Sequence, residues 1–260
     1  MRSVFRRSDE LVLERGLAPA RVQRWPRDAT VAQLLLLDPQ IVVSAAQLQA
    51  WARQLADQGI DTIRTGALGW EQAGEAEAAG MHCIQQLTLL EARAPFTGRP
   101  TAPPVTAGAR PTTRPPRSRR AVTRDFEPLA CIDLAAFGQI WGLDARTLRE
   151  ISSATPLHRS RIVHARDASP GRRHPAGFVI CGRSGDIAYV QRLGVHPDHH
   201  RQGLATALLD DAFAWMRRFG AARAYVNTHI ENRPALLLYR SYGFTELIER
   251  LKVYETRVPT

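Results

Sequence analysis

Two patterns of apolar residues follow each other closely in the C-terminal half of the chain. Residues Ile187 to Val195 are rich in β-branched and aromatic side chains, which is typical of a strand, and His196-Pro197-Asp198 predicts a turn at its end. Apolar residues then recur at steps of three or four, which predicts one face of a helix that ends at Gly220. That face consists of Leu204, Leu208, Ala212, Trp215 and Phe219.

A second strand and a shorter helix come next. Residues Ala222 to Asn227 predict the strand. Asn232 stands where a helix cap belongs, Pro234 suits a first helical turn, and Gly243 ends the helix after about two and a half turns. This helix carries Tyr239 near its end.

The N-terminal half repeats this order in a weaker form. When Gly59 is aligned with Gly220, a helix, a strand, a short helix and a final strand fall in register. The matching segments are 45–58, 60–65, Gly80-Met81 near Gly243-Phe244, and Cys83 to Glu91 against Leu247 to Glu255. The pattern indicates either a degenerate repeat or a chance similarity between two α/β segments.

The N-terminal repeat lacks the residues that make the C-terminal one chemically interesting. Val43-Ser44-Ala45 contains no glycine before the helix, and no tyrosine occurs between Gly66 and Gly80. A fragment of about 90 residues with few strands gains stability by packing against a partner. We therefore expect an intramolecular pseudo-dimer, with a homodimer as the alternative.

Residues 93 to 124 differ in composition from both halves. They contain seven prolines and eight arginines, no acidic residue and few large apolar groups, which predicts a linker. We expect domains at 1–92 and 120–260, joined by a linker at 93–119. These arginines account for most of the formal net charge of +10. The linker is either a proline-stiffened tether or a segment that contacts nucleic acid, the ribosome or another anionic surface.

Other features narrow the class of protein. At 260 residues the chain is long enough for one large or two small domains. No apolar run approaches the ~20 residues that span a bilayer, and the arginines near the N-terminus lack an adjoining signal-peptide core. We therefore expect a cytoplasmic protein without membrane contact. Cys83, Cys131 and Cys181 lack the spacing of metal ligands, and we expect them to be buried small apolar residues.

The start of the longer helix has the composition of an anion site. Gly203 allows close approach of the backbone, Ala205 keeps the first turn slim, and Arg201 adds a charged donor. The helix would point its unpaired N–H groups and the positive end of its dipole into the preceding loop, where an oxyanion is stabilised. The alternative is that these small residues only allow tight packing.

Three histidines stand before this helix, at His196, His199 and His200. Pro197 kinks the segment and no cysteine stands nearby, so we expect no metal site. We expect the histidines to flank the bound anion and to carry charge only below about pH 6.5. The affinity for the anion would then rise modestly on acidification.

Together these residues resemble the GCN5-related N-acetyltransferase (GNAT) family, whose pattern is Gln/Arg-x-x-Gly-x-Gly/Ala followed by an Asn-to-Tyr-x-x-x-Gly-Phe helix. The resemblance covers roughly residues 120–256. It implies an α/β (α+β) fold with a mixed, mostly antiparallel central sheet flanked by helices, plus a smaller α/β N-terminal domain. It also implies acetyl-coenzyme A (acetyl-CoA) as co-substrate, and no metal. The sequence Phe-x-x-x-Trp-x-Leu-Asp at residues 137–144 is similar to actinobacterial members related to the ribosomal-protein N-acetyltransferases.

The resemblance also assigns coenzyme-binding residues. In the family, the strand before the loop exposes backbone groups to the pantetheine arm, and the loop and helix hold the pyrophosphate. His200 stands where Gln or Arg is usual, which implies a weaker contact with phosphate. The implied coenzyme-binding residues are Leu193, Gly194, Val195, His200, Arg201, Gln202, Gly203, Leu204, Ala205, Thr206, Asn232 and Tyr239.

The catalytic residues are less clearly marked. The resemblance assigns to Tyr239 the protonation of the departing thiolate, and a phenol of pKa about 10 is protonated at neutral pH. The alternative is that Tyr239 is only a core aromatic residue. In some relatives a Glu at the position of Asn227 acts as the general base. Asparagine cannot take over this role, because its amide does not accept a proton. Glu231, His229 and a water held by Asn227 remain as candidate bases, and Glu231 is alternatively a favourable first-turn charge. On the preceding strand, where other relatives place a Glu, stand Tyr189, Gln191 and Arg192.

The lack of a strong base bears on the acceptor. At pH 7 a lysine side chain of pKa about 10.4 is neutral roughly once in several thousand, whereas an α-amine of pKa about 7.7 to 8.0 is neutral in roughly one molecule of ten. We therefore expect a protein N-terminal α-amine, or a small molecule with a weakly basic amine.

The family resemblance implies that two predicted helices, at about 128–137 and 144–152, determine which acceptor binds. Phe137 and Trp141 are flanked by Asp133 and Asp144. In one interpretation, the two aromatic residues form an apolar wall and the two aspartates an anionic rim for the amine. In the other, Phe137 is a core residue and the aspartates are solvated charges at helix ends.

Three functions remain open from the sequence. The preferred one is an acetyl-CoA-dependent N-acetyltransferase with a structural or regulatory N-terminal domain. The second is a catalytically weak acetyl-CoA sensor or scaffold, and the third is a nucleic-acid-associated protein that acts through the basic linker. Calorimetry with acetyl-CoA separates the third from the first two, and thiol release with an amine panel separates the first from the second.

Overall fold

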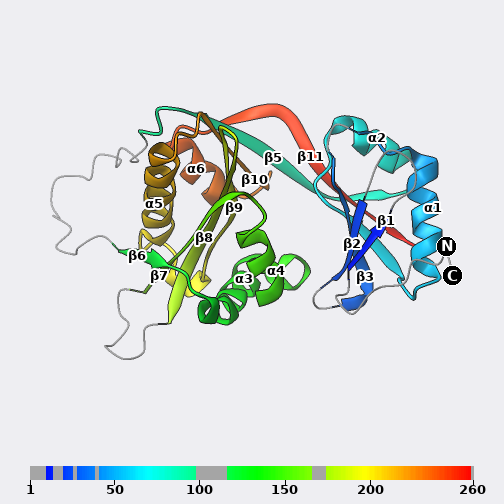
Figure 1. Ribbon diagram of the computed structural model, residues 1–260, viewed down its shortest axis with the longest axis horizontal. Coiled ribbons are helices and arrows are strands. Elements are labelled where there is room, and N and C mark those ends of the chain that lie inside the picture. Colours follow the sequence, from blue (N-terminus) through cyan, green and yellow to red (C-terminus); the bar gives the residue numbers. More distant parts are fainter. Residues whose placement is uncertain are drawn as a thin grey trace. The chain divides into compact units, whose positions relative to one another are not determined.

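The computed structural model describes residues 10–13, 20–25, 28–38, 41–97, 116–165 and 174–258. They form two compact units (Figure 1). Unit 1 consists of residues 1–89, 227–231 and 247–260, and unit 2 consists of residues 90–226 and 232–246. Within the described residues, no helix is long and apolar enough to cross a membrane.

Unit 1 is a sheet with two helices. Its strands lie in the order β1-β2-β3-β4-β11-β5, where β5 and β11 contribute the parts that belong to this unit. The strands are β1 (Glu10–Leu13), β2 (Ala20–Trp25), β3 (Asp28–Leu36), β4 (Thr62–Thr65), β5 (His82–Arg93) and β11 (Thr245–Arg257), and the helices are α1 (Ala45–Ala56) and α2 (Trp70–Ala78). Strands β3 and β4 pair in parallel, whereas β1 with β2, β2 with β3, and β4 with β11 pair antiparallel. Leu48, Trp51 and Leu55 of α1 are buried in the core of this unit.

Unit 2 has helices on both faces of its strands. The end of β5 is followed in the sheet by β10, β9, β8, β7 and β6. The strands are β6 (Ser118–Arg120), β7 (Leu157–His164), β8 (Pro175–Ser184), β9 (Ile187–Val195) and β10 (Arg223–His229); the helices are η1 (Thr123–Asp125), α3 (Phe126–Trp141), α4 (Ala145–Ser152), η2 (Pro197–His199), α5 (Leu204–Arg218) and α6 (Arg233–Ser241). Only β9 with β10 is a parallel pair among the registers of this unit's described strands. These features confirm the predicted mixed, mostly antiparallel sheet flanked by helices.

Alternate residues of β8 supply the two cores of unit 2. Val179 and Cys181 pack with α5 and α6, whereas Phe178 and Ile180 pack with α3 and α4. A strand that is buried on both faces reads as an almost continuous apolar run, which is the character of residues 176–181. This sheet therefore places the α3–α4 pair and the α5–α6 pair on opposite faces.

The predicted repeat between the two halves is visible in the order of elements. Unit 1 contains β3, α1, β4, α2 and then β5, and the C-terminal half contains β9, α5, β10, α6 and then β11. The first two strands of each series form the parallel pair of their unit. The glycines that end the helices adopt left-handed backbone conformations in both series, with φ of 75° at Gly59, 70° at Gly220, 84° at Gly80 and 81° at Gly243.

The two short helices also end with the same hydrogen bonds. In α2 the Met81 N–H donates to the carbonyl of Ala76, and in α6 the Phe244 N–H donates to the carbonyl of Tyr239. The preceding glycines bond in the same way: the Gly80 N–H donates to the carbonyl of Glu77, and the Gly243 N–H donates to the carbonyl of Arg240. Ala76 is therefore the counterpart of Tyr239 in this repeat.

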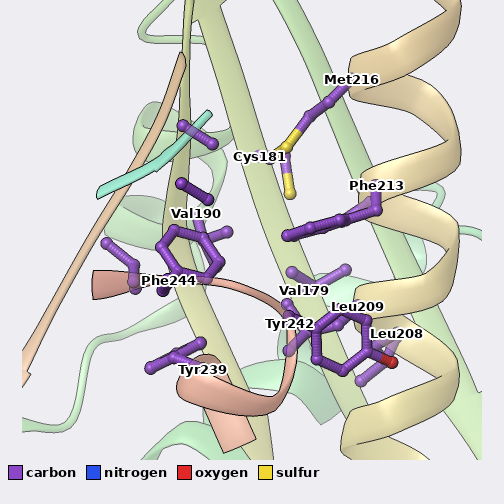
Figure 2. Close-up of a cluster of buried hydrophobic side chains, with 14 of the residues drawn as sticks. Val179, Cys181, Val190, Leu208, Leu209, Phe213, Met216, Tyr239, Tyr242 and Phe244 are labelled. Atoms are coloured by element: carbon purple, nitrogen blue, oxygen red, sulfur yellow. The ribbon is translucent and has the colours of Figure 1, made fainter. Parts of the chain in front are cut away.

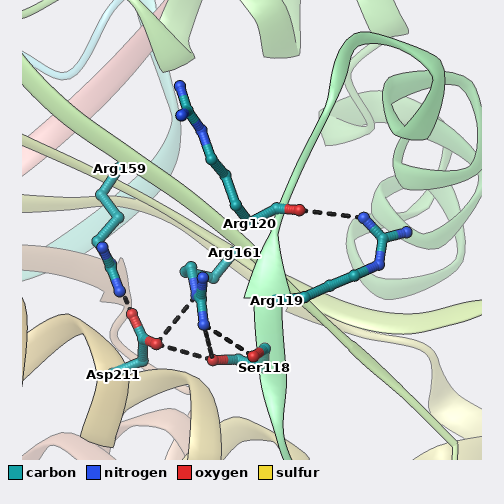
Figure 3. A network of polar contacts seen from close by, with 6 residues as sticks. All are labelled: Ser118, Arg119, Arg120, Arg159, Arg161 and Asp211. Carbon is teal, nitrogen blue, oxygen red and sulfur yellow. Dashed lines mark hydrogen bonds and ion pairs between the residues drawn. The ribbon is translucent and has the colours of Figure 1, made fainter.

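Both ends of the predicted linker are part of the folded unit. Phe96 is 1% exposed in the α5 core, and Ser118–Arg120 form the edge strand β6. Figure 3 shows how β6 is held: the carboxylate of Asp211 on α5 accepts from the Ser118 hydroxyl at 2.8 Å and from Arg159 Nε at 2.6 Å, and it lies 2.9 Å from Arg161 Nε. Residues 98–115 of the predicted linker lie outside the described residues.

The cysteines correct one expectation. Cys181 is buried as predicted, but Cys83 and Cys131 are exposed. Cys131 lies on α3 at a helical position that points away from the sheet, whereas its neighbour Ile132 is buried. The error arose because the preference of cysteine for the interior is only an average, and the face of the helix decides the burial of each residue.

Candidate functional site

The strands β9 and β10 stay paired over a short distance only. Among the described residues, their parallel register runs from Ile187 opposite Arg223 to Tyr189 opposite Tyr225. Strand β9 continues to Val195, and it remains paired with β8 on its other side. The backbone of Leu193 to Val195 thus has one edge without a partner from β10, which leaves N–H and C=O groups for an extended ligand.

The helix α5 begins without a side-chain cap. Gly203 occupies the cap position in a left-handed conformation, with φ of 74°, and no side chain of the described residues accepts from the first turn. Arg201, two residues earlier, is the one described non-glycine residue with positive φ, at 59°. The first amides of a helix have no partner inside the helix. Those of Leu204, Ala205 and Thr206 therefore form a group of donors at the positive end of the helix dipole.

The side chains around this loop are polar and mostly exposed. His200 Nε2 lies 3.1 Å from the carbonyl oxygen of Val195, so its ring is turned toward β9. His196 Nδ1 accepts from the Asp198 N–H at 3.3 Å. No group of three or more potential metal ligands occurs within the described part of the chain.

Tyr239 projects from α6 into the core beneath α5. Figure 2 shows it in one cluster with Val190, Cys181 and Phe244, and its ring packs edge-on against Phe244 with centroids 5.6 Å apart. Tyr239 is only 5% exposed.

Asn232 caps the start of α6, because its side chain accepts a hydrogen bond from the Ala235 N–H at 3.3 Å.

Burial decides the acidity of the Tyr239 phenol. The pKa of Tyr239 is raised above its usual value of 10, chiefly by loss of solvation and further by the nearby Cys181 thiol, while Arg192 acts weakly in the opposite direction. Burial also raises the pKa of Cys181, to about 12. Both groups therefore keep their protons across the neutral range. A phenol of this kind donates a hydrogen bond to a developing thiolate more readily than it gives up its proton to one.

A buried ion pair links α3 to β9. Arg192 donates from Nε and Nη2 to the two oxygens of Asp133, at 2.7 and 2.8 Å, and Nη2 also donates to the Trp141 carbonyl at 2.7 Å. The guanidinium lies 3.5 Å from the centroid of the Phe137 ring. Asp133 also accepts from the Leu143 N–H at 2.6 Å. The pair therefore connects the turn between α3 and α4 to β9, the strand that precedes the loop 196–203.

This arrangement corrects both predicted roles of Asp133 and leaves Asp144 at a helix end, as one of the alternatives expected. Asp133 is 0% exposed and already neutralised by Arg192, so it is neither an anionic rim nor a solvated charge. Asp144 caps α4, because its carboxylate accepts from the Thr147 N–H at 2.7 Å. Phe137 faces Gly194, where an added Cβ would lie 3.4 Å from the ring. The wall beside Gly194 is thus aromatic and carries a compensated charge.

The candidate bases Asn227 and Glu231 fall in the short segment that belongs to unit 1. Both residues are exposed. The Glu231 N–H donates to His229 Nδ1 at 3.2 Å. The other predicted site residues, which come from β9, the loop 196–203, α5 and α6, all belong to unit 2.

The sequence reasoning missed the partner of Arg192. Strict alternation along β9 would place Arg192 on the same face as Val190, which packs with α5 and α6. A register shift puts Val190 opposite Cys181 but Arg192 opposite Ile180, so Gln191 is an extra residue and Arg192 turns toward α3. The one sequence signal for the pair was Asp133 itself, which follows the buried Ile132 inside an apolar helix.

Comparison with known proteins places this geometry in a family. A family model described as Acetyltransferase (GNAT) family matches residues 133–244. The [Ribosomal protein bS18]-alanine N-acetyltransferase of Escherichia coli is 35% identical over 81 residues, which are 31% of this chain and 55% of that protein. N-alpha-acetyltransferase 60 of Drosophila melanogaster is 27% identical over 135 residues, which are 47% of this chain and 46% of that protein. The chain thus spans about half the length of these relatives.

A solved structure resembles the whole chain in fold. It is described as a tandem GNAT protein from the clavulanic acid biosynthesis pathway, and it has a TM-score of 0.64 at 17% identity. The similarity covers 96% of this chain and 83% of that one. A tandem neighbour fits the repeat of elements in the two halves. Residues 133–244 of this chain therefore match the family model of the GNAT acetyltransferases, and the fold of the whole chain resembles that of a tandem GNAT protein.

Proposed function

We propose that unit 2 catalyses acetyl transfer from acetyl-CoA to an amine, with an N-terminal α-amine as the preferred acceptor. The observation that carries this proposal is the uncapped start of α5 next to the end of the β9–β10 pairing. Membership of the GNAT family and the two N-acetyltransferase relatives support the reaction type.

The described residues fit the parts of acetyl-CoA. The first amides of α5, with Arg201 beside them, suit the pyrophosphate because they combine unpaired donors with positive charge. Gly203 keeps the left-handed turn that lets these amides face one ligand. The free edge of Leu193 to Val195 suits the amide-containing pantetheine arm, which pairs with backbone as a strand does.

The reaction then needs few groups from the chain. The neutral amine attacks the thioester carbonyl, the C–N bond forms, the C–S bond breaks with its electron pair on sulfur, and the ammonium proton passes to solvent. A backbone N–H near Val195 would stabilise the carbonyl oxygen as charge develops on it. Tyr239 would stabilise the departing sulfur through its protonated phenol. The protein N-termini acted on by the relatives support an α-amine acceptor, which is neutral often enough at pH 7 to react without a strong base.

A second function, acetyl-CoA binding without turnover, is favoured by one observation. The pKa of Tyr239 is raised by burial, which weakens this phenol as a proton donor. In this case the domain would bind the coenzyme and acetylate nothing at a useful rate.

One experiment distinguishes the two functions. The full chain is incubated with acetyl-CoA and three acceptors: a peptide with a free alanine N-terminus, the same peptide blocked at its N-terminus but carrying lysine, and spermidine. Thiol release and mass spectrometry follow the products. The enzyme proposal predicts acetylation of the first peptide at least ten times faster than of the second. Coenzyme binding with no acetylated product from any acceptor would instead establish the second function.

A further inference from the structure

We propose that Asp133 and Arg192 form a positioning and charge-setting pair for the acceptor. The pair holds the turn 138–143 against β9 and cancels its own charge. The site then accepts a single amine carried by an apolar group, such as the N-terminus of a peptide with an apolar first residue, and disfavours polycationic amines. This inference rests on the proposed acetyl transfer and names the acceptor class of the same site.

The first argument is the geometry of the turn. α3 is broken at Gly138, which has φ of 76° and ψ of 179°, and the N–H of Gly142 donates to the Gly138 carbonyl at 2.8 Å. Such a break leaves few bonds inside the helix to fix the following turn. The Arg192 bond to the Trp141 carbonyl and the Asp133 bond to the Leu143 N–H replace them. The pair therefore adds two hydrogen bonds that hold the turn, beside the bond between Gly142 and Gly138.

The second argument is the position of Arg192 on β9. It directly precedes Leu193 to Val195, the proposed pantetheine-binding edge. Phe137, on which the guanidinium stacks, also covers Gly194: an added Cβ there would lie 2.9 Å from Phe178 and 3.4 Å from Phe137. A change in the pair would consequently move the aromatic wall closest to the reacting thioester.

The third argument is charge. The charge of Arg192 is neutralised by Asp133, an aspartate that is 0% exposed. The turn also presents an apolar side chain, since Ile140 is 58% exposed beside the exposed Gln139. Removal of either charged partner would leave the other uncompensated in a poorly solvated place, where its effect on a nearby ammonium is large.

The test compares four chains: wild type, Asp133→Asn, Arg192→Gln and the double variant. The amide pair in the double variant can still hydrogen-bond but carries no charge. Arg149→Gln with Glu127→Gln serves as a matched control. This ion pair also involves α3, which it joins to α4, but it is exposed; Arg149 Nη2 lies 2.9 Å from Glu127 Oε1. Acceptor binding is measured by calorimetry with spermidine and with a peptide that begins with a free alanine, so that the result does not depend on turnover.

The proposal predicts an order of selectivity. The affinity for spermidine relative to the peptide should rise about tenfold in Arg192→Gln, fall about tenfold in Asp133→Asn, and return close to the wild-type ratio in the double variant. The double variant should bind the peptide at least threefold more weakly, because the turn is less firmly held. The control should match the wild type throughout.

A ratio that stays the same in all four chains would overturn the proposal, because a purely structural pair would not order ligands by charge. If Arg192→Gln does not fold, the wild type, Asp133→Asn and the double variant still decide the order. Kinetics run alongside separate this inference from the proposed function: charge-ordered binding without acetyl transfer would retain the pair as a selectivity device and reject the reaction.

Discussion

The first helices of the two repeats, α1 and α5, differ in whether their first N–H groups have partners. In unit 2, α5 begins at Gly203 without a side-chain cap. In unit 1, Ser44 caps α1 by accepting from the Gln47 N–H at 3.3 Å, and the Glu75 carboxylate accepts from the Ala45 N–H at 2.6 Å. An anion that bound there would have to displace a carboxylate from the same chain. The helix start of unit 1 is thus already occupied, and that of unit 2 is available.

The second helices differ in the same direction. Glu75 and Ala76 of α2 correspond to Leu238 and Tyr239 of α6, by the shared hydrogen bonds at the helix ends. Unit 1 therefore has a capping carboxylate and a methyl group where unit 2 has an apolar side chain and a phenol. The comparison teaches that one backbone plan serves either as a closed structural unit or as a ligand site. A few side chains at the two helices decide between them.

The largest expected effect comes from placing a carboxylate at the start of α5, where the start of α1 already has that of Glu75. In Ala205→Glu the new side chain would compete for the first amides and repel the pyrophosphate, and we expect the affinity for acetyl-CoA to fall at least a hundredfold. Ala214→Glu is the matched control, because Ala214 is exposed on the same helix but far from its start. Calorimetry measures both variants. Equal affinities would show that the helix start does not bind the coenzyme.

Replacement of Tyr239 should affect rate more than binding. Tyr239→Phe removes the hydroxyl and keeps the ring that packs against Phe244. We expect kcat to fall about ten- to a hundredfold, with less than a twofold change in the dissociation constant of acetyl-CoA. Tyr225→Phe is a suitable control, since Tyr225 lies on β10 where that strand still pairs with β9. A Tyr239→Phe enzyme with full kcat would leave this residue with a packing role alone.

The pH dependence should show that the buried protons stay in place. Because the pKa of Tyr239 is raised, its ionisation should cause no loss of kcat up to about pH 10. Folding stability should behave differently. The pKa of Cys181 is raised to about 12 in the folded state, so its contribution is complete below the pKa of the unfolded thiol and declines above it.

Between about pH 8.5 and 10 this thiol should therefore cost about 1.4 kcal/mol of unfolding free energy for each pH unit. Cys181→Ala should flatten the dependence in that interval, although its stability at pH 7 will be lower because a small cavity is left. Urea denaturation at a series of pH values measures both. An unchanged slope in the variant would mean that Cys181 ionises as easily in the folded protein as in the unfolded one.

The smallest expected effect lies in unit 1. Ser44→Ala removes the cap of α1 and should lower the free energy of unfolding by about 0.5 to 1 kcal/mol, toward the low end because the bond is long. The affinity for acetyl-CoA should not change. Denaturant titration and calorimetry on the same variant test the two parts, and weaker coenzyme binding would contradict the structural role given to this helix start.

Local patterns in the sequence predicted much of this structure. The helix at Leu204–Arg218, the short helix with Tyr239 near its end and the repeat in the N-terminal half all depend on periodicity and on glycine stops, which act within a few residues. The left-handed glycines at the helix ends follow from the same local rule. The fold class and the family resemblance could therefore be read from the chain.

The remaining features depend on contacts that no local pattern encodes. The inclusion of residues 247–260 in unit 1 comes from the antiparallel pairing of β11 with β4, far apart in sequence. The Asp133–Arg192 pair requires a bulge in β9 that reverses the face of Arg192. The Glu75 bond to the start of α1 joins two helices across 30 residues. In each case the two partners lie far apart in the sequence, so no local pattern predicts the contact.

The most direct test of the difference between the two repeats is the stoichiometry of acetyl-CoA binding. We predict one site per chain by calorimetry, lost in Ala205→Glu and unaffected by Glu75→Gln. Two sites per chain, or a single site that Glu75→Gln abolishes and Ala205→Glu leaves intact, would contradict the assignment of the coenzyme to unit 2.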